Sequence, residues 1–176
     1  NQSFQSFLSN TWWCRLNRGD GTDPRLTDKD EWFSVMEGSS FFHSTLDDEY
    51  NCSMFYLSLW PGLLDLQLNQ WPHLQKSHEE SGGVFLCHDM GRAVQVAEQA
   101  YGHDMPVEEN CNYVLFMQVY AHWTGDLTVV ERHADLIERI GKYLIWADRD
   151  GSGFPCEGTP NTLDDASPAT EVARKQ

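Results

Sequence analysis

The chain has 176 residues, a length that suits one domain with one hydrophobic core, and 40% of them are apolar, which excludes a disordered tail. Its formal net charge of −15 argues against binding to nucleic acid or to an anionic membrane surface, because both need a basic face. The charge instead favours a neutral or cationic ligand or a bound metal ion, and no apolar run approaches the roughly 20 residues of a membrane span.

The first 36 residues alternate short apolar runs with turn residues. SFLSNTWWC and EWFSVM flank the polar stretch LNRGDGTDPRLTDKD, a pattern that predicts two strands joined by a turn. We therefore expect residues 1–36 to form a β-rich lead-in whose last strand carries Glu37 at its end.

Helical patterns follow. Residues 47–60 place acids first and apolar residues later, and residues 61–71 begin with Pro-Gly, which together predict a pair of helices. The stretch 72–92 resembles a loop, with glycines as breakers. Residues 106–125 predict a strong helix, because proline and two glutamates occupy its first turn.

The helix predicted next, over residues 128–148, carries one apolar stripe opposite its charged face. The stripe consists of Val129, Val130, His133, Leu136, Ile137, Ile140 and Leu144. A long loop follows, and Ser167-Pro168 is typical of the start of another helix. The chain opens without an initiator methionine and closes just as this helix begins, so we expect a segment of a longer protein.

The candidate catalytic and binding residues gather in the loops. Glu37 ends an apolar strand before Gly38, where a nucleophilic carboxylate would face a cleft, although this segment alone favours a solvated turn glutamate. Asp47 and Asp48 follow ten and eleven residues later. His88 and Asp89 follow the apolar run GVFLC and suit the binding of sugar hydroxyls, or else belong to an ordinary loop.

Two further clusters lie near the end of the chain. Asp148, Asp150 and Ser152 alternate with glycine-rich positions in ADRDGSGFP, a pattern that suits Ca²⁺ but also a simple turn. The stretch NTLDD supplies Thr162 and Asp164, and Asp165 follows. Acids there favour the coming helix start through its dipole, whereas Glu37 and Asp164 together supply the two carboxyl groups that glycoside hydrolysis needs.

Taken in order, five segments resemble the retaining β-glycosidases of glycoside hydrolase families 52 and 116, or of a closely related family. They are VMEG with TLD and YNCSMFYLSLW, then LCHDMG, then YVLFMQVYAHWTGD, then WADRDGSGFP, and finally TLD near the end. The resemblance implies an (α/α)₆ barrel behind a β-rich domain. The chain would then be mainly α, with residues 37–176 forming the first half of the barrel.

The resemblance also implies residue roles. Glu37 is the expected nucleophile and Asp164 the acid/base, with Asp165 as a rival because Leu163 replaces the family's tyrosine. Asp47, His88 and Thr162 are expected to bind the glycone with Asp89 as a helper, and Asp48 rivals Asp47. Calcium, where present, would be structural and held by Asp148, Asp150 and Ser152, and no organic cofactor is expected.

We therefore predict a retaining exo-β-glycosidase, a β-xylosidase or β-glucosidase, that acts on a carbohydrate and needs the remainder of the barrel. An inverting or different hydrolase on the same barrel would also fit these residues. So would a non-catalytic helical module that binds sugar or calcium. A segment holding half a barrel would expose an apolar face, so on its own it is expected to be inactive and poorly soluble.

Overall fold

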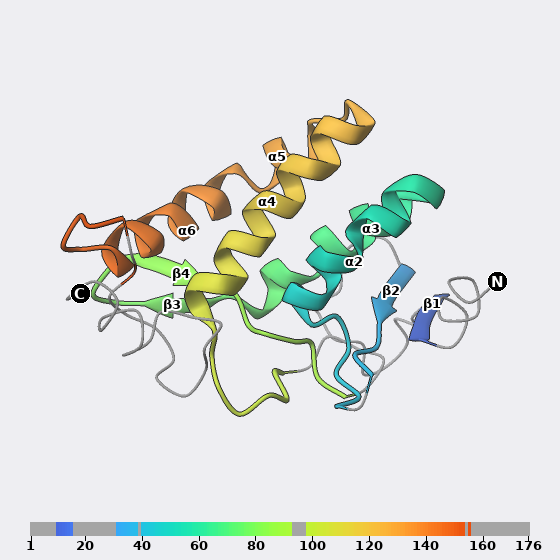
Figure 1. The fold of residues 1–176 in the computed structure, drawn as a ribbon, viewed down its shortest axis with the longest axis horizontal. Helices are drawn as coiled ribbons and strands as arrows, with labels where there is room; N and C mark the ends of the chain where they lie inside the picture. The colour runs from blue at the N-terminus through green and yellow to red at the C-terminus, as the bar shows by residue number, and fades with distance from the viewer. Residues whose placement is uncertain (1–9, 16–30, 39, 93–97, 154, 156–176) are drawn as a thin grey trace.

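The computed structural model describes residues 10–15, 31–38, 40–92, 98–153 and 155, and it is mainly helical (Figure 1). The expected mainly α class with a short β lead-in is confirmed at that level, whereas the closed (α/α)₆ barrel stays a prediction. The elements in chain order are β1 (Thr11–Arg15), β2 (Glu31–Val35), α2 (Leu46–Leu59), α3 (Pro61–Leu68), η1 (Trp71–Leu74), β3 (Lys76–His78), β4 (Gly83–Phe85), α4 (Pro106–Thr124), α5 (Thr128–Arg132) and α6 (Ala134–Ala147).

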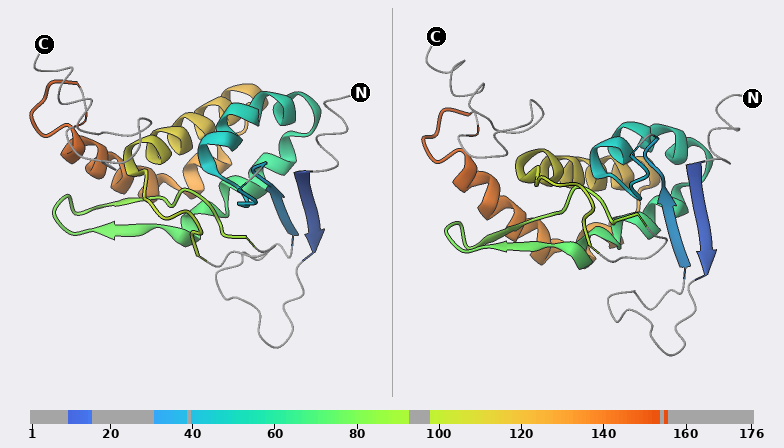
Figure 2. Two further views of the ribbon diagram at one scale, coloured as in Figure 1. Left: turned by 60° about the horizontal axis from the view of Figure 1, so that its bottom comes forward. Right: turned by 90° about the horizontal axis from the view of Figure 1, so that it is seen from below.

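The two strands expected in the lead-in are present and pair with each other. β1 and β2 run antiparallel, with Thr11 opposite Val35 and Arg15 opposite Glu31. Figure 2 shows the pair at the end of the molecule that lies opposite α6. Residues Trp32 and Phe33 of β2 are fully buried, so this strand anchors the lead-in to the helices.

Helix boundaries follow the local signals in the sequence. Pro61 begins α3 and Pro106 begins α4, as expected for a residue that has no amide hydrogen to leave unpaired. α4 ends at Gly125, whose φ of 73° gives the left-handed cap that glycine adopts most easily. None of the helices in the described ranges is long and apolar enough to cross a membrane.

Two local predictions were wrong. The stretch 72–92 is more than a loop, because it contains the 3-10 helix η1 and the antiparallel hairpin β3–β4, which lies along α6 (Figure 2). The helix predicted over residues 128–148 is interrupted at His133, where the imidazole Nε2 lies 2.9 Å from Asn69 Oδ1. Both features depend on contacts with distant parts of the chain.

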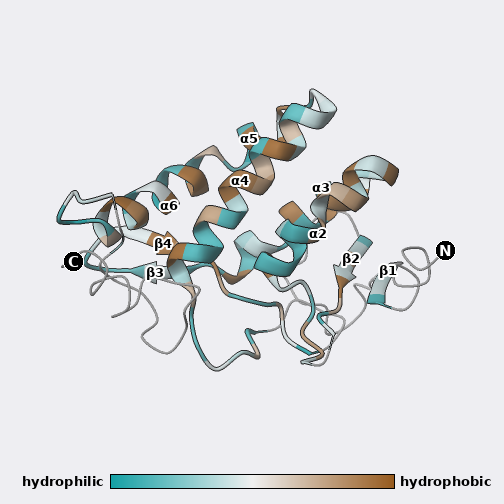
Figure 3. Cartoon of the chain, viewed as in Figure 1, coloured by the Kyte–Doolittle hydropathy of each residue, from teal (hydrophilic) through white to brown (hydrophobic). Residues whose placement is uncertain are grey.

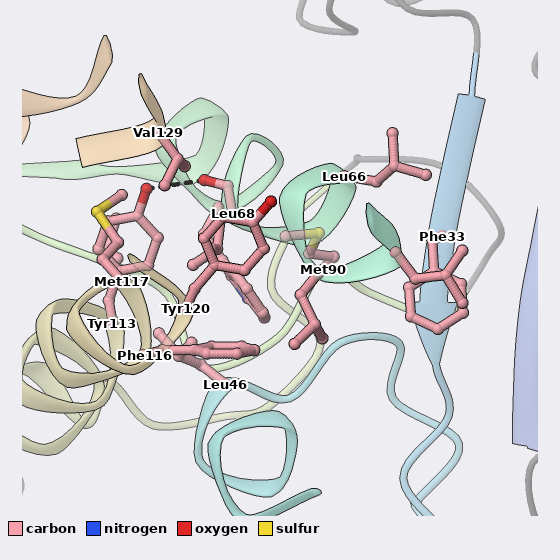
Figure 4. Packing of buried hydrophobic residues seen from close by; sticks show 14 of the residues in the cluster. Phe33, Leu46, Leu66, Leu68, Met90, Tyr113, Phe116, Met117, Tyr120 and Val129 are labelled. Atoms are coloured by element: carbon pink, nitrogen blue, oxygen red, sulfur yellow. Dashed lines mark hydrogen bonds between the residues drawn. The ribbon is translucent and has the colours of Figure 1, made fainter. Parts of the chain in front are cut away.

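The core lies between the α2–α3 pair, α4 and β2, with α5 and α6 closing one side. Figure 4 shows Tyr113 and Phe116 of α4 packing toward Leu46 and Leu68. The buried Tyr113 hydroxyl donates to the Leu68 carbonyl at 2.8 Å. Figure 3 shows hydrophobic bands recurring along α6, as the stripe predicted over residues 128–148 requires.

An open apolar groove of about 510 Å³ runs between α4 and the α5–α6 pair. Its lining consists of Val114, Met117, Gln118, Ala121, His122, Leu127, Val130 and Ile137.

Candidate functional site

Two loops that follow strands are joined edge to edge below α2 and α4 (Figure 1). The first covers residues 36–46 after β2, and the second covers residues 86–91 after β4. The His43 amide donates to Gly91 O at 2.8 Å, the Met90 amide to His43 O at 2.9 Å, and the Leu46 amide to His88 O at 2.9 Å. These bonds bring the Glu37 loop and the His88 loop together, and we call them the paired loops.

Glu37 is held by both its backbone and its carboxylate. Its amide donates to Phe42 O at 2.8 Å, and its Oε2 accepts a bond from the Thr45 hydroxyl at 2.9 Å. The loop between Glu37 and Thr45 includes two non-glycine residues with positive φ, Phe41 at 58° and Ser44 at 50°. Such conformations are costly for side chains of this kind and gather at functional sites.

Asp47 and Asp48 lie in the first turn of α2, and Asp48 lies within the electrostatic field of Glu37. The pKa of Asp48 is raised, first by partial desolvation and then by the negative charges of Asp47 and Glu37, while His88 opposes the shift. The Asp48 amide also donates to Asp47 Oδ1 at 2.8 Å. Three carboxyl groups and one imidazole that the sequence singles out therefore share one electrostatic neighbourhood.

Asp89 is fully buried and holds His88 in place. Its Oδ2 accepts from His88 Nδ1 at 3.0 Å and from the Tyr101 amide at 2.9 Å, while Oδ1 accepts from the amides of Gly91 and Ala100, both at 2.8 Å. Burial alone would raise the pKa of Asp89, but these hydrogen bonds outweigh it and lower the pKa below its ordinary value. With both oxygens occupied by internal donors, Asp89 has the geometry of a positioning residue.

The His88 imidazole is also fixed by neighbouring rings. The Tyr101 ring lies with its centroid 4.3 Å from that of His88, and the Phe42 ring meets it edge-on at 5.7 Å. The His88 amide donates to Gln99 Oε1 at 2.9 Å. His88 is therefore preorganised by contacts on several sides, which is what a binding group needs.

Glu109 completes the site and was not expected there. It is fully buried in the first turn of α4, and one ligand-type atom from each of Asp47, His88 and Glu109 lies within 4.8 Å of the other two. Asn110 fixes this approach, because its side chain accepts from the Leu86 amide and donates to Val84 O, both at 3.1 Å. The sequence offered only an acid in a first helical turn, a feature that the helix dipole already explains.

The remaining predicted residues divide into two groups. Thr162, Asp164 and its rival Asp165 lie outside the described residues. Asp148, Asp150 and Ser152 form an exposed turn after α6, in which the Gly153 amide lies 3.1 Å from both Asp148 oxygens and the Ser152 hydroxyl lies 3.4 Å from Asp148 Oδ1.

The donors of this turn are oxygens, which fits Ca²⁺ in chemical type. Gly151 and Gly153 give the turn its bend, with φ of 67° and 81°. The calcium assignment stays a prediction.

Comparison with known proteins identifies one family. Residues 24–152, well over half of the chain, match the family model described as the glutaminase A six-helical-hairpin domain. The matched range contains the paired loops, all the described helices and Glu109. No curated protein matches the chain.

Proposed function

The chain belongs to the family of glutaminase A six-helical-hairpin domains, and we propose that it carries the nucleophile of a retaining exo-β-glycosidase that cleaves β-xylosides or β-glucosides. The finer resemblance to glycoside hydrolase families 52 and 116 is part of this proposal. The observation that carries it is the gathering of Glu37, Asp47, Asp48 and His88 where the paired loops meet the first turn of α2. Carboxylates placed together beside a polar substrate are the working groups of glycoside hydrolysis.

In the proposed reaction the Glu37 carboxylate attacks the anomeric carbon while Asp164 protonates the departing glycosidic oxygen. A covalent glycosyl ester with Glu37 forms as the bond to the aglycone breaks. Asp164, now ionised, takes a proton from water, whose oxygen attacks the anomeric carbon and releases Glu37. The bond from Thr45 to Glu37 Oε2 supports this role, because it fixes the orientation of the carboxylate.

The glycone would lie against Asp47 and His88. Their positions, Asp47 in the first turn of α2 and His88 in the second of the paired loops, suit hydrogen bonds to the hydroxyl groups of the sugar, and Asp48 remains the rival of Asp47. Thr162 is assigned the same role by resemblance alone. Asp89 supports the site indirectly through its bond to His88 Nδ1.

A second candidate is hydrolysis of the side-chain amide of glutamine, which the family description favours. A free amino acid substrate carries an ammonium group, and an acidic site attracts that charge. An inverting hydrolase on the same barrel and a non-catalytic module that binds sugar or calcium are the third and fourth candidates.

The experiment uses the full-length protein with 4-nitrophenyl β-xyloside, 4-nitrophenyl β-glucoside and glutamine as separate substrates. Release of nitrophenol that falls at least about 10²-fold in both Glu37→Gln and Asp164→Asn supports the glycosidase. Glu131→Gln, on the exposed surface of α5, is the matched control and is expected to match the wild type. Asp165→Asn tests the rival acid.

The outcomes separate the candidates. Full nitrophenol release by Glu37→Gln overturns the nucleophile assignment, and ammonia release from glutamine without glycoside turnover replaces the glycosidase with an amidase. Sugar binding without any turnover supports the binding module. The anomer that NMR detects first after hydrolysis distinguishes retention from inversion.

A further inference from the structure

We propose that Asp47, His88 and Glu109 form a binding site for a divalent transition-metal ion of the zinc class. This site goes beyond glycoside hydrolysis, since none of the proposed steps uses a metal. The three residues come from the first turn of α2, the loop after β4 and the first turn of α4, so the fold alone brings them together.

The spacing of the ligand atoms fits a common ion. One atom from each residue lies within 4.8 Å of the other two. Two ligand atoms of a tetrahedral zinc ion, each at roughly 2.0–2.2 Å from the metal, are separated by about 3.4 Å. Side-chain rotations that bring the ligand atoms closer by about 1 Å would close the site around an ion.

A second observation, independent of the three ligands, is the support given to His88. Nδ1 of the imidazole is engaged by the buried carboxylate of Asp89, which is itself fixed by the amides of Gly91, Ala100 and Tyr101. This leaves Nε2 as the nitrogen for a metal. A carboxylate that orients a histidine through its other nitrogen is the arrangement that metal-binding histidines almost always have.

Glu109 lies in a segment that is tied to the strand before His88. Its neighbour Asn110 bonds to both the Leu86 amide and the Val84 carbonyl, which ties the start of α4 to the strand that leads to His88. Two carboxylates and one imidazole form a mixed oxygen and nitrogen donor set, which suits zinc and other first-row ions. The turn at Asp148–Ser152 has only oxygen donors and so suits calcium instead.

Three protein ligands leave at least one position on the ion open. On the premise of the proposed function, that position would take a sugar hydroxyl, so that Asp47 and His88 bind the glycone through the ion. This last step rests on the proposed function, whereas the metal site itself does not.

The test is a calorimetric titration of metal-free, full-length protein with ZnCl₂. We expect one ion per chain, bound by Asp47, His88 and Glu109, with affinity lowered at least about 10-fold in Asp47→Asn and in Glu109→Gln. Asp89→Asn removes the carboxylate that engages His88 Nδ1 and also disturbs the bonds from the Gly91, Ala100 and Tyr101 amides, and it is expected to weaken binding about 10- to 100-fold. Glu131→Gln is the matched control and is expected to bind as the wild type does.

Circular dichroism first establishes that each variant is folded. Glu109 is buried and its variant risks misfolding, so Asp47→Asn, at a half-buried position, keeps the test decisive. Zinc affinity unchanged in Asp47→Asn, or no zinc binding by the wild type, overturns the proposal. Glu37→Gln separates the two proposals, because it is expected to abolish hydrolysis and to retain zinc binding.

Discussion

The buried carboxyl group of Glu49 offers the sharpest test of the energetics of this fold. Glu49 lies on the inner side of α2 with 1% of its surface exposed, and its Oε1 accepts a hydrogen bond from the Val35 amide at 3.1 Å. Burial raises the pKa of Glu49 from 4.5 to about 8, although hydrogen bonds from Gln67 and Val35 pull it the other way and Asp48 adds to the rise. The substitution Glu49→Gln keeps the carbonyl acceptor and removes the titration.

The sign and size of the effect follow from these two pKa values. Because the folded pKa of Glu49 is raised, its contribution to stability is fully present below pH 4.5 and is lost as the pH rises through about 8. Each pKa unit corresponds to about 1.36 kcal/mol. Between pH 5 and pH 8 the stability lost through Glu49 is on the order of 3 to 4 kcal/mol in the wild type, and Glu49→Gln removes this contribution.

The assay is urea denaturation followed by tryptophan fluorescence at several pH values from 5 to 8. The difference in free energy of unfolding between Glu49→Gln and the wild type cancels all other titrating groups. It is expected to grow in favour of the variant as the pH rises, whereas the difference for the exposed control Glu131→Gln stays flat. A difference for Glu49→Gln that does not change with pH would refute the reasoning.

Three further predictions concern close packing, a buried histidine and a buried hydrogen bond. Gly83→Ala is expected to destabilise the protein by about 2–3 kcal/mol in urea denaturation, because the new Cβ would lie 2.5 Å from Arg139 O. The control Gly102→Ala, which has open space around it, should leave the free energy of unfolding nearly unchanged. Burial, and then the charge of Arg132, lower the pKa of His133 from 6.5 to about 4, so its contribution to stability is present above pH 6.5 and is lost towards pH 4. His133→Gln should therefore lose less stability on acidification than the wild type. Equal slopes of unfolding free energy against pH in the two proteins would contradict this. Tyr113→Phe should cost about 1–2 kcal/mol by leaving the buried Leu68 carbonyl without its donor, and an unchanged thermal midpoint would exclude this.

The helices were predictable because their signals are local. Pro61 and Pro106 begin helices and Gly125 ends one, and each acts through the backbone of its own turn. The hairpin β3–β4 was missed because each strand has three residues and its position depends on α6, where Gly83 approaches the backbone of Arg139. The break at His133 likewise depends on Asn69, 64 residues away in sequence.

The candidate site shows the same division between local and distant causes. Glu37, Asp47 and His88 were predicted from residue type and loop context, and the paired loops bring them together. Glu109 was missed because a glutamate in a first helical turn already has a local explanation. Its burial beside His88 depends on Asn110, which reaches the backbone of Leu86 across 24 residues, and no pattern in the sequence marks that contact.

The paired loops also join the site to the core, because each loop has a core residue that directly adjoins a site residue in sequence. Leu46 and Met90 are fully buried members of the hydrophobic cluster, and they adjoin Asp47 and Asp89 in sequence. The Leu46 amide bonds to His88 O, so the packing of Leu46 fixes the His88 loop as well as its own. A cavity at Leu46 or Met90 would therefore displace the site and lower stability together, since cores relax only partly around lost volume. Core packing near the paired loops is thus a determinant of site geometry, as much as the polar residues themselves.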